Sequence, residues 1–266
     1  MPFAVSALAL AFTPPPPLAI AFTPGGLLFP FYVGVAYELR ALRKLTPSTP
    51  LGGSSAGAIV ATAVACGVSE RRVRSGLADL VVDVRGGARL NVALRKQLEL
   101  LLPDDAPARA EAHALSLGYF EVLPWPGRRI VTSWTSKADL IDVVCASCGW
   151  PLFFSRWPFV RCRRSWAIDG YFSVPRSRFG CPPLTGAQTL AVTCLPRISL
   201  SAFDAENVIQ PGALRYVSEG LELPVADSQW FRWALEPASD EQIDAMVDLG
   251  REHARCWARA QDRRSS

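Results

Sequence analysis

Histidine is scarce in this chain: only His113 and His253 occur among its 266 residues. Histidine is the side chain that most often acts as a general base and the commonest metal ligand, so a site that depends on it has only two positions to use. His253 lies in residues 244–257, whose pattern predicts an amphipathic surface helix with a solvated histidine. The charged stretch 103–111 is predicted to be a loop, and His113, which follows it, is expected to be structural or exposed.

Several binding signatures are also missing. The glycine-rich turns lack the Gly-x-Gly-x-x-Gly spacing of a dinucleotide loop, and no zinc finger, RNA-recognition signature or basic helix is present. The seven cysteines have no framework spacing, and most of them are predicted to be small buried hydrophobes in a reducing compartment. Cys145-x-x-Cys148 has no second ligand pair at suitable spacing, so no metal site is predicted there. Because the binding signatures above are missing as well, no cofactor and no nucleic-acid partner are predicted.

No apolar run is long enough to cross a bilayer. Residues 1–12 are apolar, but a spanning helix takes about 20 residues, and four prolines follow at 14–17. A basic region typical of a secretory signal is absent, whereas a divergent organellar leader stays open. We expect residues 1–17 to be poorly ordered, 18–258 to form a single domain, and 259–266 to be an Arg/Ser tail. With 50% hydrophobic and 20% charged residues, that domain can bury a full core.

The most informative motif is Gly-Ser-Ser-Ala-Gly at 53–57, which has the G-x-S-x-G spacing of a nucleophile elbow. In such an elbow a serine occupies a sharp strand-to-helix turn, and glycines leave room for the strained backbone. Residues 49–52 are predicted to close a buried strand, and the small apolar residues 56–67 predict a helix that ends at a glycine. Ser55 is therefore the candidate nucleophile, although the same spacing occurs by chance in ordinary loops.

A second glycine-rich turn lies upstream, at Pro24-Gly25-Gly26-Leu27. The apolar residues 18–22 before it predict a buried strand, and residues 30–45 after it predict a helix. Glycines at the start of a helix present backbone N–H groups without obstruction, as stabilisation of an oxyanion requires. The alternative is a tight turn between a strand and a helix with no catalytic role.

Asp169 is the better candidate for the general base. Residues 165–168 predict a short strand that delivers the carboxylate to its end, and Gly170 follows. A partly desolvated carboxylate within reach of the Ser55 hydroxyl can accept its proton directly. Two alternatives remain: an ordinary Asp-Gly turn, or a Ser–His–Asp esterase that uses His253. The helical setting of His253 argues against the second, because α/β-hydrolases carry this histidine on a loop.

Taken in this order, the three motifs resemble the patatin-like phospholipase family. The resemblance continues through residues 136–154, which look like the family's helix ending in Ala-Ser-x-x-x-Pro, and through 189–196, which look like the strand that follows. It therefore covers roughly residues 18–200. It implies an α/β fold with three α/β/α layers, a central mostly parallel sheet and a helical carboxyl-terminal part.

The resemblance also implies a lipid acyl hydrolase that cleaves fatty-acyl esters of phospholipids or neutral glycerolipids through an acyl-enzyme intermediate. The implied site residues are Ser55 as nucleophile, Asp169 as base, Gly25 and Gly26 as oxyanion donors, and Gly53, Gly57 and Gly170 as supports. The implied partner is a lipid at a membrane or lipid-droplet surface, reached from the cytoplasm or peripherally on the membrane. No metal or cofactor is implied.

Two positions depart from the family pattern. Pro24 stands where a third glycine is common, which removes one N–H, and Tyr171 stands where a small residue commonly follows Asp-Gly. Either change can narrow the site or lower activity. A catalytically weak or inactive lipid-binding protein is therefore an alternative.

Residues 150–166 combine aromatic side chains with four arginines. One hypothesis places this segment at the mouth of the site, where the rings meet acyl chains and Arg163 and Arg164 meet headgroup phosphates. In the other, the aromatics are core and the arginines are solvated. The same arginines permit a rival function, a nucleic-acid or phosphoinositide binding module without catalysis, but no further signature accompanies them.

Overall fold

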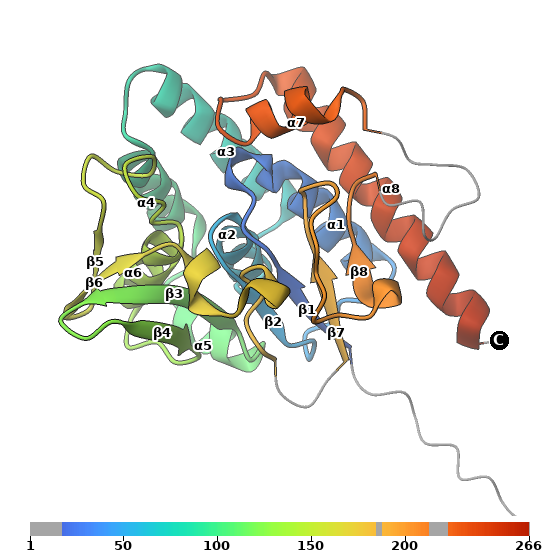
Figure 1. Ribbon diagram of the computed structural model, residues 1–266, viewed down its shortest axis with the longest axis horizontal. Helices are drawn as coiled ribbons and strands as arrows, with labels where there is room; N and C mark the ends of the chain where they lie inside the picture. The colour runs from blue at the N-terminus through green and yellow to red at the C-terminus, as the bar shows by residue number, and fades with distance from the viewer. Residues whose placement is uncertain (1–17, 185–187, 213–222, 266) are drawn as a thin grey trace, which may run out of the picture.

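The computed structural model describes residues 18–184, 188–212 and 223–265, so the predicted amino-terminal segment 1–17 lies outside it. Within these residues one eight-stranded sheet has the order β5-β6-β3-β2-β1-β7-β8, with β4 paired to β3 (Figure 1). The strands are β1 (Leu18–Phe22), β2 (Leu51–Gly53), β3 (Ser116–Leu123), β4 (Gly127–Val131), β5 (Val160–Cys162), β6 (Ser165–Ile168), β7 (Gln188–Val192) and β8 (Val208–Ile209).

The centre of the sheet is parallel and one side is antiparallel. Strand β1 pairs in parallel with β2 and β7, and β2–β3 and β7–β8 are parallel too. Strand β3 pairs antiparallel with β4 and β6, and β6 with β5. The prediction of an α/β fold with a central mostly parallel sheet is confirmed.

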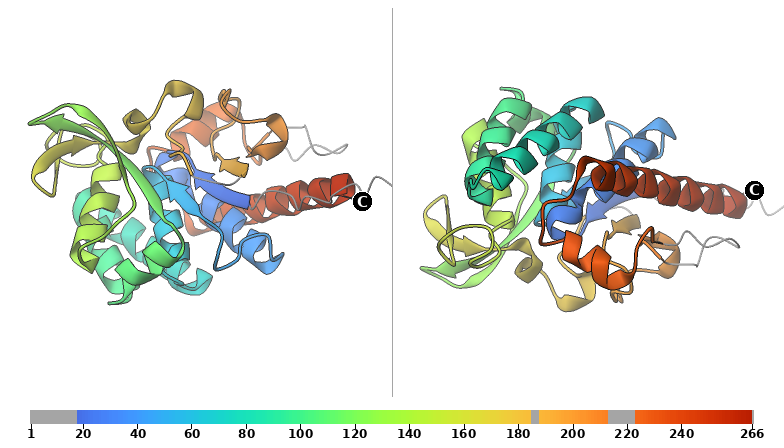
Figure 2. Two further views of the ribbon diagram at one scale, coloured as in Figure 1. Left: turned by 90° about the horizontal axis from the view of Figure 1, so that it is seen from below. Right: turned by 90° about the horizontal axis from the view of Figure 1, so that it is seen from above.

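Helices supply the connections between the strands. They are α1 (Phe29–Ala41), α2 (Ala56–Ala65), α3 (Glu70–Arg85), α4 (Leu90–Leu101), α5 (Ala106–Ala112), α6 (Lys137–Ser147), α7 (Asp227–Trp233) and α8 (Asp240–Ser265). Figure 2 shows α3 to α6 gathered on one side of the sheet, with the short 3-10 segments η2 (Gly170–Ser173) and η3 (Arg176–Arg178) on the other. Helix α8 packs along α1, which confirms the helical carboxyl-terminal part.

Alternation along β1 separates two apolar layers. Successive side chains of a strand point to opposite faces, so Ile20 and Phe22 enter the main core beneath the helices, whereas Ala21 faces a smaller cluster. That cluster includes Cys181 and Leu200, which lie on the face covered by loops and 3-10 turns. The sheet is thus buried on both faces, as parallel strands require.

The two predicted strand–turn–helix units form as expected. Strand β2 leads through the 53–57 turn into α2, and β1 leads through the glycines at 25 and 26 into η1 (Gly26–Leu28) and α1. Helix α2 is buried along nearly its whole length because its alanines and Gly57 let it lie against the sheet. A Cβ at Gly57 would overlap the carbonyl oxygen of Phe22 on β1.

Two segments expected to be loops are helical. The charged stretch 103–111 contains most of α5, whose Ala106 and Ala110 are buried against the core. The Arg/Ser tail continues α8 as far as Ser265, and Arg264 pairs with Glu206 at 3.0 Å. In both cases polar composition marked a solvated helical face, and packing of the opposite face determined the structure.

The described cysteines are free thiols, and all but Cys256 are buried. Burial raises the pKa of Cys145 to about 12, and it also raises that of Cys148, so both thiols stay protonated. Among the described residues no group of three or more His, Cys, Asp or Glu could hold a metal ion. None of the helices in the described ranges is long and apolar enough to cross a membrane.

Candidate active site

Ser55 occupies a strained turn between β2 and α2. Its backbone has φ 55° and ψ −127°, a positive φ that residues with a side chain rarely adopt. The flanking glycines are required by space, because a Cβ at Gly53 would overlap the carbonyl of Gly57. This geometry lifts the half-buried Ser55 side chain off the end of the sheet at the start of α2.

Ser147, at the last position of α6, holds this turn in place. Its buried hydroxyl accepts a hydrogen bond from the Ser55 N–H at 2.9 Å and donates one to the carbonyl of Gly118 at 2.6 Å. The donation to Gly118 uses the only hydroxyl proton, so the oxygen faces the Ser55 amide as an acceptor. The strained nucleophile backbone is therefore fixed to both α6 and β3.

Asp169 follows β6 directly and is fully buried. Burial raises its pKa from 3.8 to about 7, whereas the Tyr171 N–H and the Ser55 hydroxyl act in the opposite direction. Oδ1 accepts the Tyr171 N–H at 2.8 Å, and Oδ2 is buried with no hydrogen-bond partner among the described residues. The Ser55 hydroxyl thus approaches this carboxyl without forming a regular hydrogen bond, as is common for catalytic pairs before substrate binds.

Gly170 allows Asp169 to come this close. A Cβ at Gly170 would overlap the carbonyl oxygen of Gly118, and would lie 2.7 Å from Ser147 Oγ. The two predicted members of the dyad and the supporting glycines therefore converge at one point. They come from two segments of the chain, around β2 and around β6, and Ser147 joins them from the end of α6.

The predicted oxyanion loop presents free amides. Within the described residues the N–H groups of Gly25 and Gly26 donate to no protein acceptor, and neither does that of Ala56, the first residue of α2. The buried Tyr32 hydroxyl donates a hydrogen bond to the carbonyl of Pro24 at 3.2 Å and so helps to hold the loop in place. The loop therefore offers two unused donors, and α2 adds a third.

Pro24 and Tyr171, the two residues that depart from the family pattern, both contact residues 179–180. The ring of Pro24 packs against Gly180, where a Cβ would overlap it, and Pro24 removes only its own N–H. Tyr171 supplies its backbone N–H to Asp169, while its ring packs edge-on against Phe179 at 5.1 Å. Both residues thus line the cavity wall and leave the amides of the loop free.

A cavity of about 530 Å³ opens at Ser55. No charged side chain is among its lining residues, which are Pro24, Gly25, Gly26, Leu27, Phe29, Ser55, Ala56, Ile59, Leu80, Leu90, Leu94, Cys148, Trp150, Phe153, Phe154, Tyr171, Phe179, Leu195, Phe231, Ala234 and Leu235. A cavity of this size and lining suits a flexible apolar ligand.

The structure does not bring His253 to Ser55. His253 lies on the face of α8 that packs against α1, where Nδ1 is 2.9 Å from the carbonyl of Leu249 and the ring packs edge-on against Phe31. The expectation of a solvated histidine is therefore wrong, and burial lowers the pKa of this side chain. His113 is half-buried beside the carbonyl of Thr49, so neither histidine lines the cavity.

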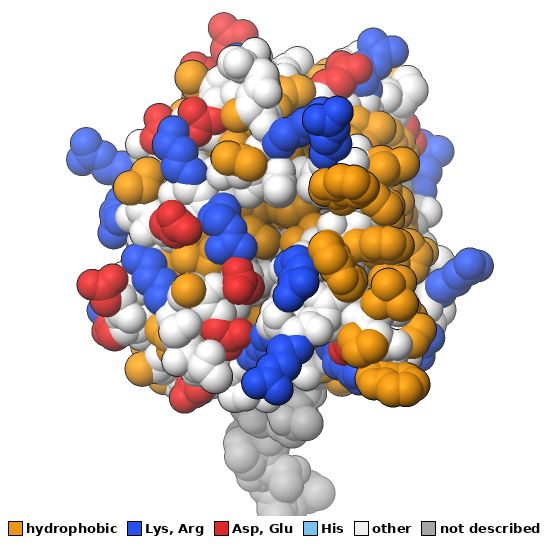
Figure 3. Space-filling model, turned by 90° about the vertical axis from the view of Figure 1, so that its left-hand side faces the viewer, with side chains coloured by type: hydrophobic (Ala, Val, Ile, Leu, Met, Phe, Trp, Pro, Cys, Tyr) orange, Lys and Arg blue, Asp and Glu red, His pale blue; other side chains and the backbone are white. Residues whose placement is uncertain are grey.

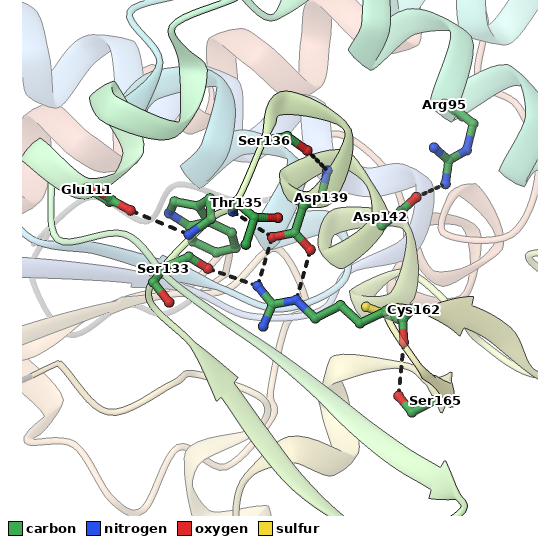
Figure 4. Close-up of polar contacts among 11 residues, drawn as sticks. Arg95, Glu111, Ser133, Thr135, Ser136, Asp139, Asp142, Cys162 and Ser165 are labelled. Atoms are coloured by element: carbon green, nitrogen blue, oxygen red, sulfur yellow. Dashed lines mark hydrogen bonds and ion pairs between the residues drawn. The ribbon is translucent and has the colours of Figure 1, made fainter.

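Residues 150–166 were expected either at the mouth of the site or with their aromatic rings in the core. Trp150, Phe153 and Phe154 line the cavity, in agreement with a place at its mouth. Arg163 forms a bidentate ion pair with Asp139 at 2.8 and 2.9 Å, and Figure 4 shows two dashed contacts on the Asp139 carboxylate. That pair ties the β5–β6 hairpin to the first turn of α6, and the headgroup role of Arg163 stays a prediction.

Sequence reasoning missed three parts of this site. Ser147 belongs to the Ala-Ser-x-x-x-Pro segment, but the sequence does not show that its hydroxyl meets Ser55. The Ala56 amide follows from the elbow geometry and was predictable from it. The contribution of α7 to the cavity, through Phe231, had no local signal because an apolar helix residue is ordinarily core.

A family model matches this chain, and two solved structures are among those similar to it. A family model described as patatin-like phospholipase matches residues 20–177, which is more than half of the chain. Among solved structures, VipD from Legionella pneumophila is 13% identical, with a TM-score of 0.43 over 91% of this chain and 68% of VipD. The type III effector protein ExoU is 15% identical, with a TM-score of 0.43 over 93% of this chain and 53% of ExoU.

The chain thus spans about half the length of the ExoU chain. A search of curated proteins found no match. The family model covers both glycine turns, the Ala-Ser-x-x-x-Pro segment and Asp169, the residues that converge on the cavity. On this match the chain belongs to the patatin-like phospholipase family.

Proposed function

We propose that this protein hydrolyses fatty-acyl esters of phospholipids or neutral glycerolipids with Ser55 as nucleophile and Asp169 as general base. The observation that carries the proposal is the buried carboxylate oxygen Oδ2 of Asp169, which has no regular hydrogen-bond partner among the described residues and lies beside a strained serine at an apolar cavity. An unpartnered buried oxygen is costly for stability, and acceptance of the Ser55 proton gives it a function.

The first half of the reaction forms an acyl-enzyme. Asp169 takes the hydroxyl proton of Ser55 while Ser55 Oγ attacks the ester carbonyl carbon, and the negative charge moves to the carbonyl oxygen. The amides of Gly25, Gly26 and Ala56 stabilise that oxygen. When the tetrahedral intermediate collapses, the carbon–oxygen bond to the alcohol breaks and Asp169 gives its proton to the leaving alcohol.

The second half releases the fatty acid. Asp169, ionised again, takes a proton from a water molecule that attacks the acyl-enzyme carbonyl. Collapse of the second tetrahedral intermediate breaks the bond to Ser55, whose oxygen recovers the proton from Asp169. The cycle needs no histidine and no metal ion, because one carboxyl alternates between base and acid.

The cavity supports the choice of substrate class. It has no charged lining residue, so it suits the acyl chain, and the polar part of the lipid stays at the opening. Tyr171 and Phe179 contribute rings to one wall, and leucines of α3 and α4 contribute another. This apolar lining supports an acyl chain as the buried part of the substrate and excludes no particular headgroup.

A covalent probe tests the nucleophile and the base together. We expect a fluorophosphonate with an alkyl chain to label Ser55, identified by mass spectrometry of the labelled peptide. The labelling rate should rise with pH through a midpoint near 7, because the reactive ionised Asp169 has a pKa of about 7. Below that midpoint the rate should fall about tenfold per pH unit.

Ser55→Ala is the control for labelling at other serines. An adduct on another residue, or a rate that is flat between pH 5 and pH 8, would contradict the proposed dyad. A protein that is folded, binds lipid and yet is never labelled would instead support the alternative of a catalytically inactive lipid-binding protein.

Ser147→Ala tests the positioning of Ser55. The substitution leaves the buried Ser55 N–H without an acceptor, which costs about 1–3 kcal/mol, and relaxes the strained turn. We expect kcat for an acyl ester to fall about tenfold or more with little change in KM. Ser165→Ala is the matched control, because Ser165 is also buried and donates to a carbonyl, that of Cys162, at 3.1 Å. Equal kcat for the two variants would rule out the positioning role.

A further inference from the structure

Large apolar side chains remain exposed on two segments that are distant in sequence and that both contribute residues to the cavity lining. We name these residues the mouth patch: Trp150, Leu152, Phe153, Trp157, Phe172, Phe231 and Leu235. The first five belong to residues 150–172, and the last two lie in and just after α7.

The mouth patch is continuous with the inside of the cavity. Four of its members, Trp150, Phe153, Phe231 and Leu235, also line the cavity. Trp150 stacks on Phe172 with ring centroids 5.8 Å apart, so the apolar surface extends from the cavity lining to the exposed ring of Phe172. A contiguous exposed apolar patch of this kind marks an interaction site.

The charge in the first of these two segments, up to residue 166, has one sign. Residues 149–166 contain four arginines and no aspartate or glutamate. Arg163 is used by its ion pair with Asp139, and Arg161 lies over the ring of Trp166 at 5.3 Å. Arg156 and Arg164 are exposed and form no ion pair within the described residues.

Figure 3 looks onto the side of the molecule where β5 and β6 lie. Hydrophobic side chains gather along one side of this face, and Lys and Arg side chains stand beside them. Trp and Arg together suit a bilayer interface, since rings enter the boundary between headgroups and acyl chains and cations meet phosphates.

We propose that the mouth patch docks on a lipid bilayer that contains anionic phospholipid, with Arg156 and Arg164 at the headgroups. This proposal rests on the proposed function, because a docked cavity would receive its substrate from that bilayer. A second copy of the chain or another protein seated there would cover the cavity opening. A bilayer instead supplies acyl chains to the opening that it covers.

Vesicle flotation with the Ser55→Ala protein tests the proposal without turnover. The vesicles contain phosphatidylcholine alone or phosphatidylcholine mixed with phosphatidylserine, an anionic lipid that attracts basic surfaces. We expect binding to the anionic vesicles and at least tenfold weaker binding when Leu152→Ser and Trp157→Ser are added. Arg156→Ala with Arg164→Ala should remove the preference for anionic vesicles.

Leu100→Ser is the matched control. Leu100 is 63% exposed, close to the 69% of Leu152, but it lies on α4 and outside the mouth patch. Leu100→Ser should leave vesicle binding unchanged. Equal loss with Leu100→Ser, or full binding by the Leu152→Ser/Trp157→Ser protein, would overturn the proposal. A change in sedimentation mass in place of a change in vesicle binding would also overturn it, in favour of a second copy.

A parallel assay separates docking from catalysis. With Ser55 present, Leu152→Ser and Trp157→Ser should lower turnover of vesicle lipid and spare a soluble short-chain ester, since neither residue lines the cavity. If no ester is turned over at all, the proposed function fails, while the Ser55→Ala flotation result still decides the docking proposal.

Discussion

Asp169→Asn is expected to lower kcat for an acyl ester by about a thousandfold or more, with the fold intact. Asparagine has nearly the same shape and keeps the oxygen that accepts the Tyr171 N–H at 2.8 Å. It cannot take the Ser55 proton at neutral pH, because an amide is not a base in this range. The loss should therefore appear in kcat, measured with a fluorogenic acyl ester.

Stability provides a separate measurement on the same variant. The pKa of Asp169 is raised by burial from 3.8 to about 7, so the native carboxyl holds its proton more tightly than the unfolded one. Its contribution to stability is fully present below pH 3.8 and is lost as the pH rises through 7. At pH 8 the asparagine variant should therefore unfold at the same temperature as wild type or at a higher one.

His253→Gln is the control for this experiment. Its ring packs against Phe31 and contacts the carbonyl of Leu249, so its loss should affect thermal stability and leave the turnover of folded protein near normal. An Asp169→Asn protein with more than a tenth of the wild-type kcat would exclude the dyad. A large loss of kcat with folded His253→Gln would restore a histidine mechanism.

Gly26→Ala is expected to lower kcat about a hundredfold. Gly26 has φ +57°, and a Cβ at this position would overlap the carbonyl oxygen of Ala234, a backbone atom that cannot rotate away. The turn must then shift and carry the amides of Gly25 and Gly26 off the developing oxyanion. Loss of such donors costs about 10²–10³ in kcat. The measurement compares kcat with the rate of fluorophosphonate labelling.

Gly87→Ala is the control that separates the effect of backbone strain from the effect of moving the 24–27 turn. Gly87 has φ +93° and nothing lies within 4 Å of a Cβ placed there, so alanine meets the same kind of backbone strain without an overlap. It should destabilise the protein modestly and leave kcat unchanged. If Gly26→Ala keeps kcat within threefold of wild type, the 24–27 turn is not the oxyanion loop.

The two strand–turn–helix units were predictable because their signals are local. Short apolar runs before the glycines, and helical periodicity after them, occur within about 30 residues of sequence at each unit. The same local patterns misled at α5 and at the end of α8. There the charged residues form the solvated face of a helix, and contacts such as Arg264 with Glu206 join residues that are distant in sequence.

The candidate site depended on more distant contacts. Local patterns predict that Asp169 ends a strand, but its complete burial depends on the way β6, η2 and α6 pack together. The sequence predicted that Arg163 meets a headgroup, and the structure places Asp139 of α6 beside it in an ion pair. His253 was expected in water, and the packing of α8 on α1 buries it.

The sequence by itself determined the candidate nucleophile, the carboxylate and the two glycine turns, because backbone geometry at sharp turns restricts which residues fit there. Only the tertiary structure decided that the Ser147 hydroxyl meets the Ser55 amide, that the Asp169 carboxyl is desolvated, and that α7 closes an apolar cavity. These features arise where segments far apart in the chain come into contact, and burial and hydrogen-bond partners exist only after those segments have packed.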